Sequence, residues 1–339
     1  MRIKIKGLKI RNFRCIGELD LDFTDPDGNP LDLVVLAGPN GCGKTSVLEA
    51  IKILLDWDVI VDAKDRNLVR LSDVSQGAEK YQLIFVMDCA EDFAEFRIEG
   101  PHYHFHASRP PYNQMGGKGK WSEYRNRIPE MPFEYFSSRR RQKLVPSLPV
   151  SDERKDKEAA PEEIDRLFSL QRRCIDQWVH SSLNRHDPAS DPKVRAIIDP
   201  LEKAWEIFYP GAESQFIVRS VNKDNPEEGV NLYLRRKDGT EIPVNDLSSG
   251  EIEVLTMAGW FVMEDYKGGI VLIDEPELHM HVQWHRAIMR ALRVLLPKTQ
   301  IIVATHSWDI LKSVMSYERF TLLREGDPRT AVDSKAVIR

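Results

Sequence analysis

A short glycine-rich stretch, "GPNGCGKT", has residue types that could hold a chain of phosphates. It matches the pattern G-x-x-x-x-G-K-[ST] at every required position and ends in Lys44 and Thr45. Glycines let backbone N–H groups approach phosphate oxygens, the lysine reaches the β- and γ-phosphates, and the threonine hydroxyl is a Mg²⁺ ligand. The residues predicted to bind nucleotide are Gly38, Pro39, Asn40, Gly41, Cys42, Gly43, Lys44, Thr45 and Ser46.

The residues on either side of this loop have the patterns that the motif requires. Residues 31–37 form a continuous apolar run, which is typical of a buried parallel strand. Residues 45–57 carry apolar side chains at helical spacing, so the phosphates are expected to rest on a helix N-terminus. A chance glycine turn is the alternative, and it is disfavoured because a strand and a helix flank the motif.

A second set of chemical groups follows another apolar run, "GGIVLIDEPELHMH". The run predicts a buried strand that ends in two acids, Asp274 and Glu275, followed by a proline. Acids at the carboxyl end of such a strand lie beside the phosphate loop of a nucleotide-binding sheet. We therefore predict that Asp274 holds Mg²⁺ and that Glu275 positions and deprotonates an attacking water. The alternative is a strand that merely ends in a polar turn.

Two more motifs have positions that favour contact with phosphate. His306 ends the apolar run 300–305, where its imidazole could reach a γ-phosphate, although a lone histidine is more often structural. "LSSGE" begins a predicted helix with Ser248 and Ser249 as cap candidates and Glu251 in the first turn. A helix start of this kind can hold an anion, and a well-capped helix without a ligand is the alternative.

The composition is that of an ordinary soluble globular protein. The 339 residues are 42% hydrophobic and 30% charged, and no apolar run approaches the roughly 20 residues of a membrane span. A net charge of −5 gives no global reason to expect nucleic-acid binding. The N-terminus alternates charged and apolar residues like a strand, and the four cysteines have no C-x-x-C spacing. We therefore expect a cytoplasmic protein without a membrane association.

The order of elements predicts an α/β fold. Two strands in residues 1–24 and a later meander over 81–108 predict an antiparallel subdomain. Residues 151–209 predict a helical lobe whose second helix is interrupted at Pro200. The remainder alternates helix and strand, which indicates a parallel sheet. The predicted domains are 1–150, the helical insert 151–215, and 216–339.

Taken together, the four motifs resemble the ABC-type ATPase head of the RecF/SMC/OLD group, a P-loop NTPase. The resemblance covers roughly residues 1–57, which include "LKIRNFRCI", and residues 245–323, where "LSSGE" resembles the signature motif and "ATHS" the His switch. The signature departs from L-S-G-G-Q at two positions, where Ser249 replaces glycine and Glu251 replaces glutamine. Both departures resemble the RecF and OLD proteins more than transporter ATPases.

The resemblance implies a Mg²⁺-dependent ATPase that forms a homodimer around ATP. The catalytic residues would be Lys44, Glu275 and His306. Ser248, Ser249, Gly250 and Glu251 would bind the nucleotide held by the other subunit, with Ser249 and Gly250 at its γ-phosphate. The Q-loop glutamine, a further metal ligand, would be Gln142, with Gln76 and Gln82 as alternatives.

Features that do not match narrow the expected role. There are no sustained heptads for coiled-coil arms, and only a short tail follows residue 324, so no nuclease domain is expected in this chain. The family resemblance implies control of a separate effector protein, such as a nuclease, in prokaryotic antiphage defence or DNA maintenance. The alternative is a RecF-like repair ATPase that acts directly on DNA, for which the basic run 139–143 is a candidate contact and a solvated surface run is the simpler interpretation.

Overall fold

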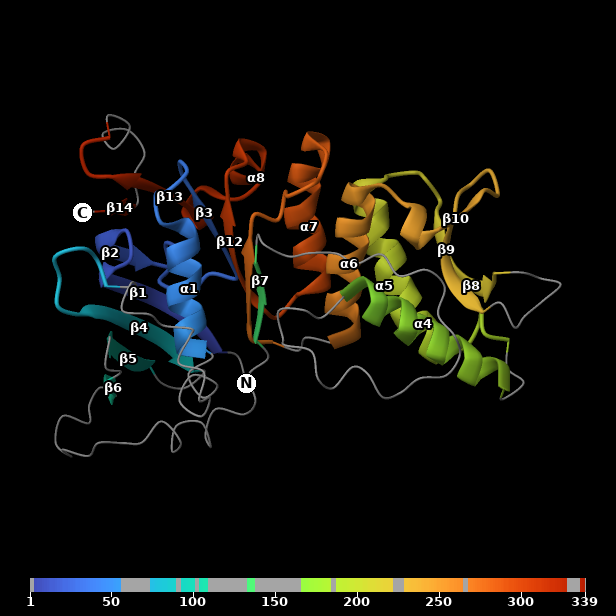
Figure 1. The fold of residues 1–339 in the computed structure, drawn as a ribbon, viewed down its shortest axis with the longest axis horizontal. Coiled ribbons are helices and arrows are strands. Elements are labelled where there is room, and N and C mark those ends of the chain that lie inside the picture. Colours follow the sequence, from blue (N-terminus) through green and yellow to red (C-terminus); the bar gives the residue numbers. More distant parts are fainter. Residues whose placement is uncertain are drawn as a thin grey trace. The chain divides into compact units, whose positions relative to one another are not determined.

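The computed structural model describes residues 3–55, 74–89, 93–100, 104–108, 133–137, 166–183, 187–221, 229–264, 268–327 and 336–338. The chain divides into two compact units, whose elements Figure 1 labels. The first unit comprises Met1–Ser138, Lys267–Pro276 and Lys298–Arg339, and the second comprises Arg139–Tyr266 and Glu277–Pro297. The domain boundaries at residues 150 and 215 stay a prediction. Within the described ranges, no helix is both long and apolar enough to cross a membrane.

The first unit contains a six-stranded sheet in the order β14-β13-β3-β12-β11-β7, with every neighbouring pair parallel. Its strands are β3 (Leu33–Ala37), β7 (Phe133–Phe136), β11 (Ile270–Asp274), β12 (Gln300–Thr305), β13 (Arg319–Arg324) and β14 (Ala336–Ile338). All residues of β3, β11 and β12 are buried, as expected for strands of a parallel sheet. Helix α1 (Lys44–Leu55) packs against β11 and β12. The predicted parallel sheet is confirmed.

A second, antiparallel sheet in the same unit has the order β2-β1-β4-β5-β6. Its strands are β1 (Ile3–Phe13), β2 (Ile16–Asp22), β4 (Tyr81–Cys89), β5 (Phe93–Gly100) and β6 (His104–Ser108). Apolar residues alternate with charged ones along β2, so one face enters the core and the other carries charge. This is the antiparallel subdomain that the sequence predicts.

One buried side chain joins the two sheets of the first unit. Gln300, the first residue of β12, is fully buried. Its Oε1 accepts from the N–H of Ile5 at 2.7 Å, and its Nε2 donates to the carbonyls of Ile5 at 2.8 Å and Leu31 at 3.0 Å. The amide thereby satisfies three backbone groups from segments that are far from it in sequence. Its burial has a structural reason, because its hydrogen bonds hold strand β1 against the parallel sheet.

The second unit is mainly helical. It contains α4 (Arg166–Leu183), α5 (Pro192–Phe208), α6 (Ser249–Glu264), the 3-10 turn η6 (Val282–Trp284) and α7 (His285–Leu295). The predicted interruption at Pro200 is wrong, because α5 continues through it. Seven buried residues at helical spacing line one face of α5 and outweigh the cost of an internal proline. Asp191 is the N-cap of this helix and accepts a hydrogen bond from the N–H of Lys193 at 2.8 Å.

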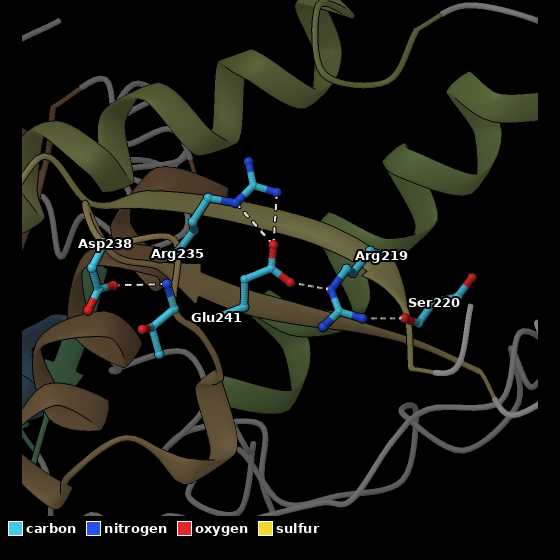
Figure 2. A network of polar contacts seen from close by, with 6 residues as sticks. Arg219, Ser220, Arg235, Asp238 and Glu241 are labelled. Atoms are coloured by element: carbon cyan, nitrogen blue, oxygen red, sulfur yellow. Dashed lines mark hydrogen bonds and ion pairs between the residues drawn. The ribbon is translucent and has the colours of Figure 1, made fainter. Parts of the chain in front are cut away.

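The second unit also contains a three-stranded antiparallel sheet, with β8 (Gln215–Ser220), β9 (Val230–Arg235) and β10 (Glu241–Pro243) in the order β10-β9-β8. Figure 2 shows Glu241 between two arginines, with one carboxylate oxygen 2.6 Å from Nε of Arg219 and the other 2.9 Å from a guanidinium nitrogen of Arg235. The hydrogen bond from Arg235 lowers the pKa of Glu241 most; burial opposes it, and the hydrogen bond from Arg219 lowers the pKa further. This carboxylate thus bonds both arginines and offsets one of their two positive charges.

We predict that replacing Gln300 with leucine destabilises the protein. Three backbone groups of Ile5 and Leu31 would lose a buried partner, and each unmet group costs about 1–3 kcal/mol. We expect the free energy of unfolding to fall by about 2–4 kcal/mol, measured by urea denaturation. The matched control is Gln82→Leu, because Gln82 is half-buried and bonds one side chain, Glu99, at 2.7 Å. Equal losses in the two variants would contradict the role of Gln300.

Candidate functional site

The predicted phosphate loop joins the end of β3 to the start of α1. Close packing requires glycine at two of its positions. A Cβ on Gly38 would lie 2.4 Å from the carbonyl oxygen of Leu322 and 2.7 Å from Sγ of Cys42. Gly43 has a φ of 95°, and its Cβ would lie 3.0 Å from the side chain of Ile16. Neither position can accept a side chain without displacing a neighbour. The loop is thus packed between strand β13 on one side and the β1–β2 turn on the other.

Lys44, the lysine of the motif, is buried inside this loop. It is 5% exposed, and its Nζ donates to the carbonyls of Gly38 and Pro39, each at 2.9 Å. Burial lowers the pKa of Lys44, against the raising influence of Cys42 and the acids Asp274 and Glu275. The ammonium is thus held by neutral carbonyl oxygens and shielded from water. An anionic ligand would stabilise its charge.

The hydroxyl of Thr45 donates to the carboxylate of Asp274 at 3.0 Å. Thr45 is exposed and Asp274 is 1% exposed, at the last position of β11. A hydroxyl and a carboxylate oxygen side by side are the hard oxygen donors that Mg²⁺ prefers. The donors of this pair fit the predicted metal site.

Glu275 and His306 meet beside the same lysine. The Nε2 of His306 lies 3.3 Å from Oε1 of Glu275, and its Nδ1 lies 3.5 Å from Nζ of Lys44. An ammonium can only donate, so Nδ1 accepts and the ring proton sits on Nε2, facing the carboxylate of Glu275. His306 thus lies between the carboxylate of Glu275 and the ammonium of Lys44.

The backbone of Glu275 is in the left-handed region, with a φ of 52°. Its N–H donates to the carbonyl of Ala304 at 2.8 Å, so the residue stays attached to β12 although β11 has ended. A non-glycine residue in this conformation costs on the order of 1 kcal/mol and is often found where function requires it. The turn directs the Glu275 side chain to His306.

The structure brings together the residues that the sequence predicts for catalysis and metal binding, except Gln142. Contacts link Lys44 to His306, His306 to Glu275, and Thr45 to Asp274. Gln142 lies outside the described residues, so its role stays a prediction. Pro39, Asn40 and Gly41 lie at the loop's accessible tip, whereas Cys42 and Ser46 are buried.

The predicted signature residues lie in the second unit and form a capping box at the start of α6. One carboxylate oxygen of Glu251 accepts from the N–H of Ser248 at 2.9 Å and from its hydroxyl at 2.7 Å. The N–H of Glu251 in turn points to the hydroxyl of Ser248 at 3.4 Å. Ser248 and Ser249 are exposed, and Gly250 is buried. The exposed groups at this helix start are therefore the two serines.

An aromatic cluster beneath the signature was not predicted. A Cβ on Gly250 would lie 2.9 Å from both the Trp284 ring and the carbonyl oxygen of His279, so glycine is required there by close packing. The Trp284 ring meets Tyr209 edge-on at 5.1 Å, and Tyr209 stacks on Trp205 at 4.7 Å. Burial, and then the nearby Glu251 carboxylate, raise the pKa of Tyr209. The segment that follows the two acids thus packs directly under the signature helix.

The structure also places residues near the loop that the sequence analysis did not assign. Arg14, in the β1–β2 turn, forms an ion pair with Glu49 of α1, and Sγ of Cys15 lies 3.7 Å from the hydroxyl of Ser46. Arg324, at the end of β13, donates to the carbonyl of Gly41 at 2.8 Å. For Arg324, the one sequence feature that pointed to the loop was its position at the carboxyl end of a predicted strand.

Histidine pairs that could have indicated a second metal site do not form one in the described part of the chain. His281 caps η6 by accepting from the N–H of Gln283, and His285 begins α7, so the two are not on one regular helix face. His104 and His106 lie on β6, and His102 is outside the described residues. Among the described residues, no group of three or more histidines, cysteines and acids could hold a metal ion.

Solved structures of SMC heads have the same fold. The Smc head bound to the C-winged helix domain of ScpA superposes with a TM-score of 0.55, at 15% sequence identity over 91% of each chain. The SMC head domain from Thermotoga maritima gives a TM-score of 0.52 at 14% identity, over 93% of this chain and 92% of that one. The predicted ABC-type ATPase head fold is confirmed.

Curated proteins of similar sequence are longer than this chain. The OLD nuclease of Thermus scotoductus is 24% identical over 364 aligned residues, which cover 97% of this chain and 63% of that protein. The Septu protein PtuA of Bacillus mycoides is 23% identical, over 98% of this chain and 42% of that protein. RecF of Leptospira interrogans is 40% identical over 79 residues, 23% of this chain and 19% of that protein. The chain thus spans less than two thirds of each of these relatives.

A family model also matches most of the chain. It is described as "AAA domain, putative AbiEii toxin, Type IV TA system" and covers residues 33–311. That range contains the phosphate loop, the signature, the two acids and His306. The chain therefore belongs to this AAA family of ATPase domains, within the RecF/SMC/OLD group of ABC-type ATPases.

Proposed function

We propose that this chain binds and hydrolyses ATP at the cluster of Lys44, Thr45, Asp274, Glu275 and His306. The observation that carries the proposal is the convergence of these five residues, from three separate segments, at one edge of the parallel sheet. A buried lysine, a metal-binding oxygen pair and a carboxylate beside a histidine are the groups that phosphoryl transfer to water needs.

The contacts of Lys44, Glu275 and His306 suggest a role for each of them in hydrolysis. Lys44 turns from the carbonyls of Gly38 and Pro39 to the phosphates, where its charge is better compensated. Glu275 accepts the proton of the attacking water. His306 holds the Glu275 carboxylate through its Nε2 proton and lies beside Lys44, so it is placed to detect whether a γ-phosphate is present.

The metal requirement follows from the same pair of oxygen donors. Thr45 and Asp274 would hold Mg²⁺, which when bound supplies positive charge that offsets the charge of the phosphates. The burial of Asp274 keeps its carboxylate next to the Thr45 hydroxyl and limits competition from bulk water.

The signature is the second half of the proposed site. Glu251 is engaged by Ser248, which leaves the exposed Ser249 and the N–H groups at the start of α6 to contact a phosphate. We infer that these groups belong to the site of a second copy of the chain, so that two copies dimerise around ATP. The ATP-dependent dimer is then a state that hydrolysis ends.

The proposed role of this dimer is to control a separate effector protein in prokaryotic antiphage defence or DNA maintenance. The proposal is supported by the similarity of this chain to the relatives named OLD nuclease and Septu protein PtuA. The RecF match is the observation that favours the second candidate, an ATPase that acts directly on DNA.

The first prediction separates nucleotide binding from folding. Lys44→Met removes the buried ammonium together with its hydrogen bonds to Gly38 and Pro39, so the two effects on stability oppose each other. We expect a change of less than about 1 kcal/mol in the free energy of unfolding, but at least roughly 100-fold weaker ATP binding by titration calorimetry. Lys52→Met, on the same helix, is the control and should bind ATP as the wild type does. Normal ATP binding by Lys44→Met would exclude this loop as the site.

The second prediction concerns the ATP-dependent dimer. Glu275→Gln keeps the size of the side chain but removes the base, so the variant should bind ATP without hydrolysing it. Light scattering at saturating ATP and Mg²⁺ should then give twice the monomer mass. A protein that stays monomeric under these conditions would contradict the shared site.

A companion variant tests the signature residue in the same assay. In the Glu275→Gln background, Ser249→Arg places a long cation at the start of α6 and should prevent the dimer while ATP still binds. Ser182→Arg is the control, because Ser182 is an exposed helical serine of the same unit. In the wild-type background, hydrolysis that survived Ser249→Arg would show that Ser249 is not at the γ-phosphate.

The third prediction distinguishes the two proposed roles by salt dependence. Direct DNA binding releases counterions, so log K falls against log salt with a slope of about −0.9 per phosphate contact. The effector role requires no such binding, and the net charge of −5 gives no global attraction to DNA. Fluorescence anisotropy with a labelled DNA duplex at several salt concentrations, with and without ATP, measures this slope. A steep slope for the protein alone would favour the RecF-like role.

A further inference from the structure

Strand β13 extends beyond its pairing with β3 and passes along the phosphate loop. The two strands are in register from Arg319 and Val35 to Thr321 and Ala37, where β3 ends. The next residue of β13, Leu322, places its carbonyl oxygen 2.4 Å from where a Cβ of Gly38 would be. The loop therefore begins in direct backbone contact with β13.

A second contact from β13 reaches the tip of the loop. A terminal nitrogen of Arg324 donates to the carbonyl of Gly41 at 2.8 Å, across 283 positions of sequence. Gly41 has a φ of 73°, and a Cβ there would have no atom within 4 Å, so the left-handed backbone and not crowding calls for glycine. A carbonyl in this conformation points away from the neighbouring N–H groups that would face a phosphate.

The loop carbonyls thus accept hydrogen bonds from two basic side chains. Lys44 bonds the carbonyls of Gly38 and Pro39, and Arg324 bonds that of Gly41. Lys44 must release its two carbonyls to reach the phosphates, whereas Arg324 can keep its contact, because one carbonyl uses only one of the five N–H donors of a guanidinium. After that exchange, Arg324 continues to hold the loop.

We propose that Arg324 is a positioning residue for nucleotide binding. It holds the Gly41 carbonyl to the outside of the loop, so that the following N–H groups stay directed at the β-phosphate when Lys44 turns to its ligand. This inference rests on the proposed ATP binding and adds a residue that none of the four sequence motifs contains. It acts on the loop and does not touch the reacting atoms.

The side of the loop on which Arg324 lies determines what it can affect. Strand β3 has β13 as one neighbour and β12 as the other, and Glu275 and His306 are attached to the β12 side. A contact on the β13 side should change how tightly the loop holds a nucleotide and not the proton transfer. ATP and ADP should be affected equally, because both carry the β-phosphate.

The experiment compares three variants of the full chain. Arg324→Ala should raise the Kd of both ATP and ADP by roughly tenfold, the value of one charge-assisted hydrogen bond, with the loss seen in KM rather than kcat. Arg324→Lys can still donate to one carbonyl and should recover most of the affinity. Arg319→Ala is the control, because its guanidinium bonds the Val314 carbonyl at 3.0 Å, at the other end of the same strand. Thermal unfolding of each variant reports whether stability alone changes.

Several outcomes would overturn the inference. These are an unchanged Kd in Arg324→Ala, a loss for ATP but not ADP, or an equal loss in Arg319→Ala. If the alanine variant unfolds at the assay temperature, Arg324→Met, whose side chain has no hydrogen-bond donor, replaces it in the same comparison with Arg324→Lys. Equal Kd values for the methionine and lysine variants would contradict the inference. Failure of the wild-type protein to bind ATP would instead refute the proposed function.

Discussion

The parallel pairing of β3 between β12 and β13 is the constraint on which the site depends. Ala37 lies opposite Thr305, and Asp274 lies opposite Ala304, so three strands end at nearly the same level. The phosphate loop, the two acids and His306 leave the sheet at that edge and meet without long connecting loops. At the other end of β12, the Gln300 amide fixes β1 to the same sheet. The register of these strands therefore decides which side chains meet at the site.

Two features of the site reduce the stability of the protein without a ligand, and a bound ligand explains why they are present. Burial lowers the pKa of Lys44, whose ammonium donates to two loop carbonyls. Glu275 keeps a left-handed backbone that a non-glycine residue rarely adopts. Neither the buried ammonium nor the left-handed backbone favours folding by itself. A bound polyphosphate with its cation would compensate the buried charge of Lys44.

The chain passes between the two compact units close to the chemical groups. It leaves the first unit at Pro276, one residue after Glu275, and re-enters it at Lys298, two residues before β12 begins. The segment between contains Trp284, which packs under Gly250 of the signature. The segment that packs under the signature therefore begins two residues after the proposed base, Glu275.

By itself, the sequence determined the residue types of the site and the kinds of elements that carry them, because loop glycines, apolar runs and helical spacing are local patterns. Lys44, Thr45, Asp274, Glu275 and His306 could be chosen in this way. The tertiary structure decided what depends on strand register and on packing between distant segments. Examples are the contact of Arg324 with Gly41, the hydrogen bonds of Gln300 to Ile5, the Trp284 ring under the signature, and the helix that continues through Pro200. The first two join residues 283 and 295 positions apart, and nothing in the chain near either partner encodes that distance.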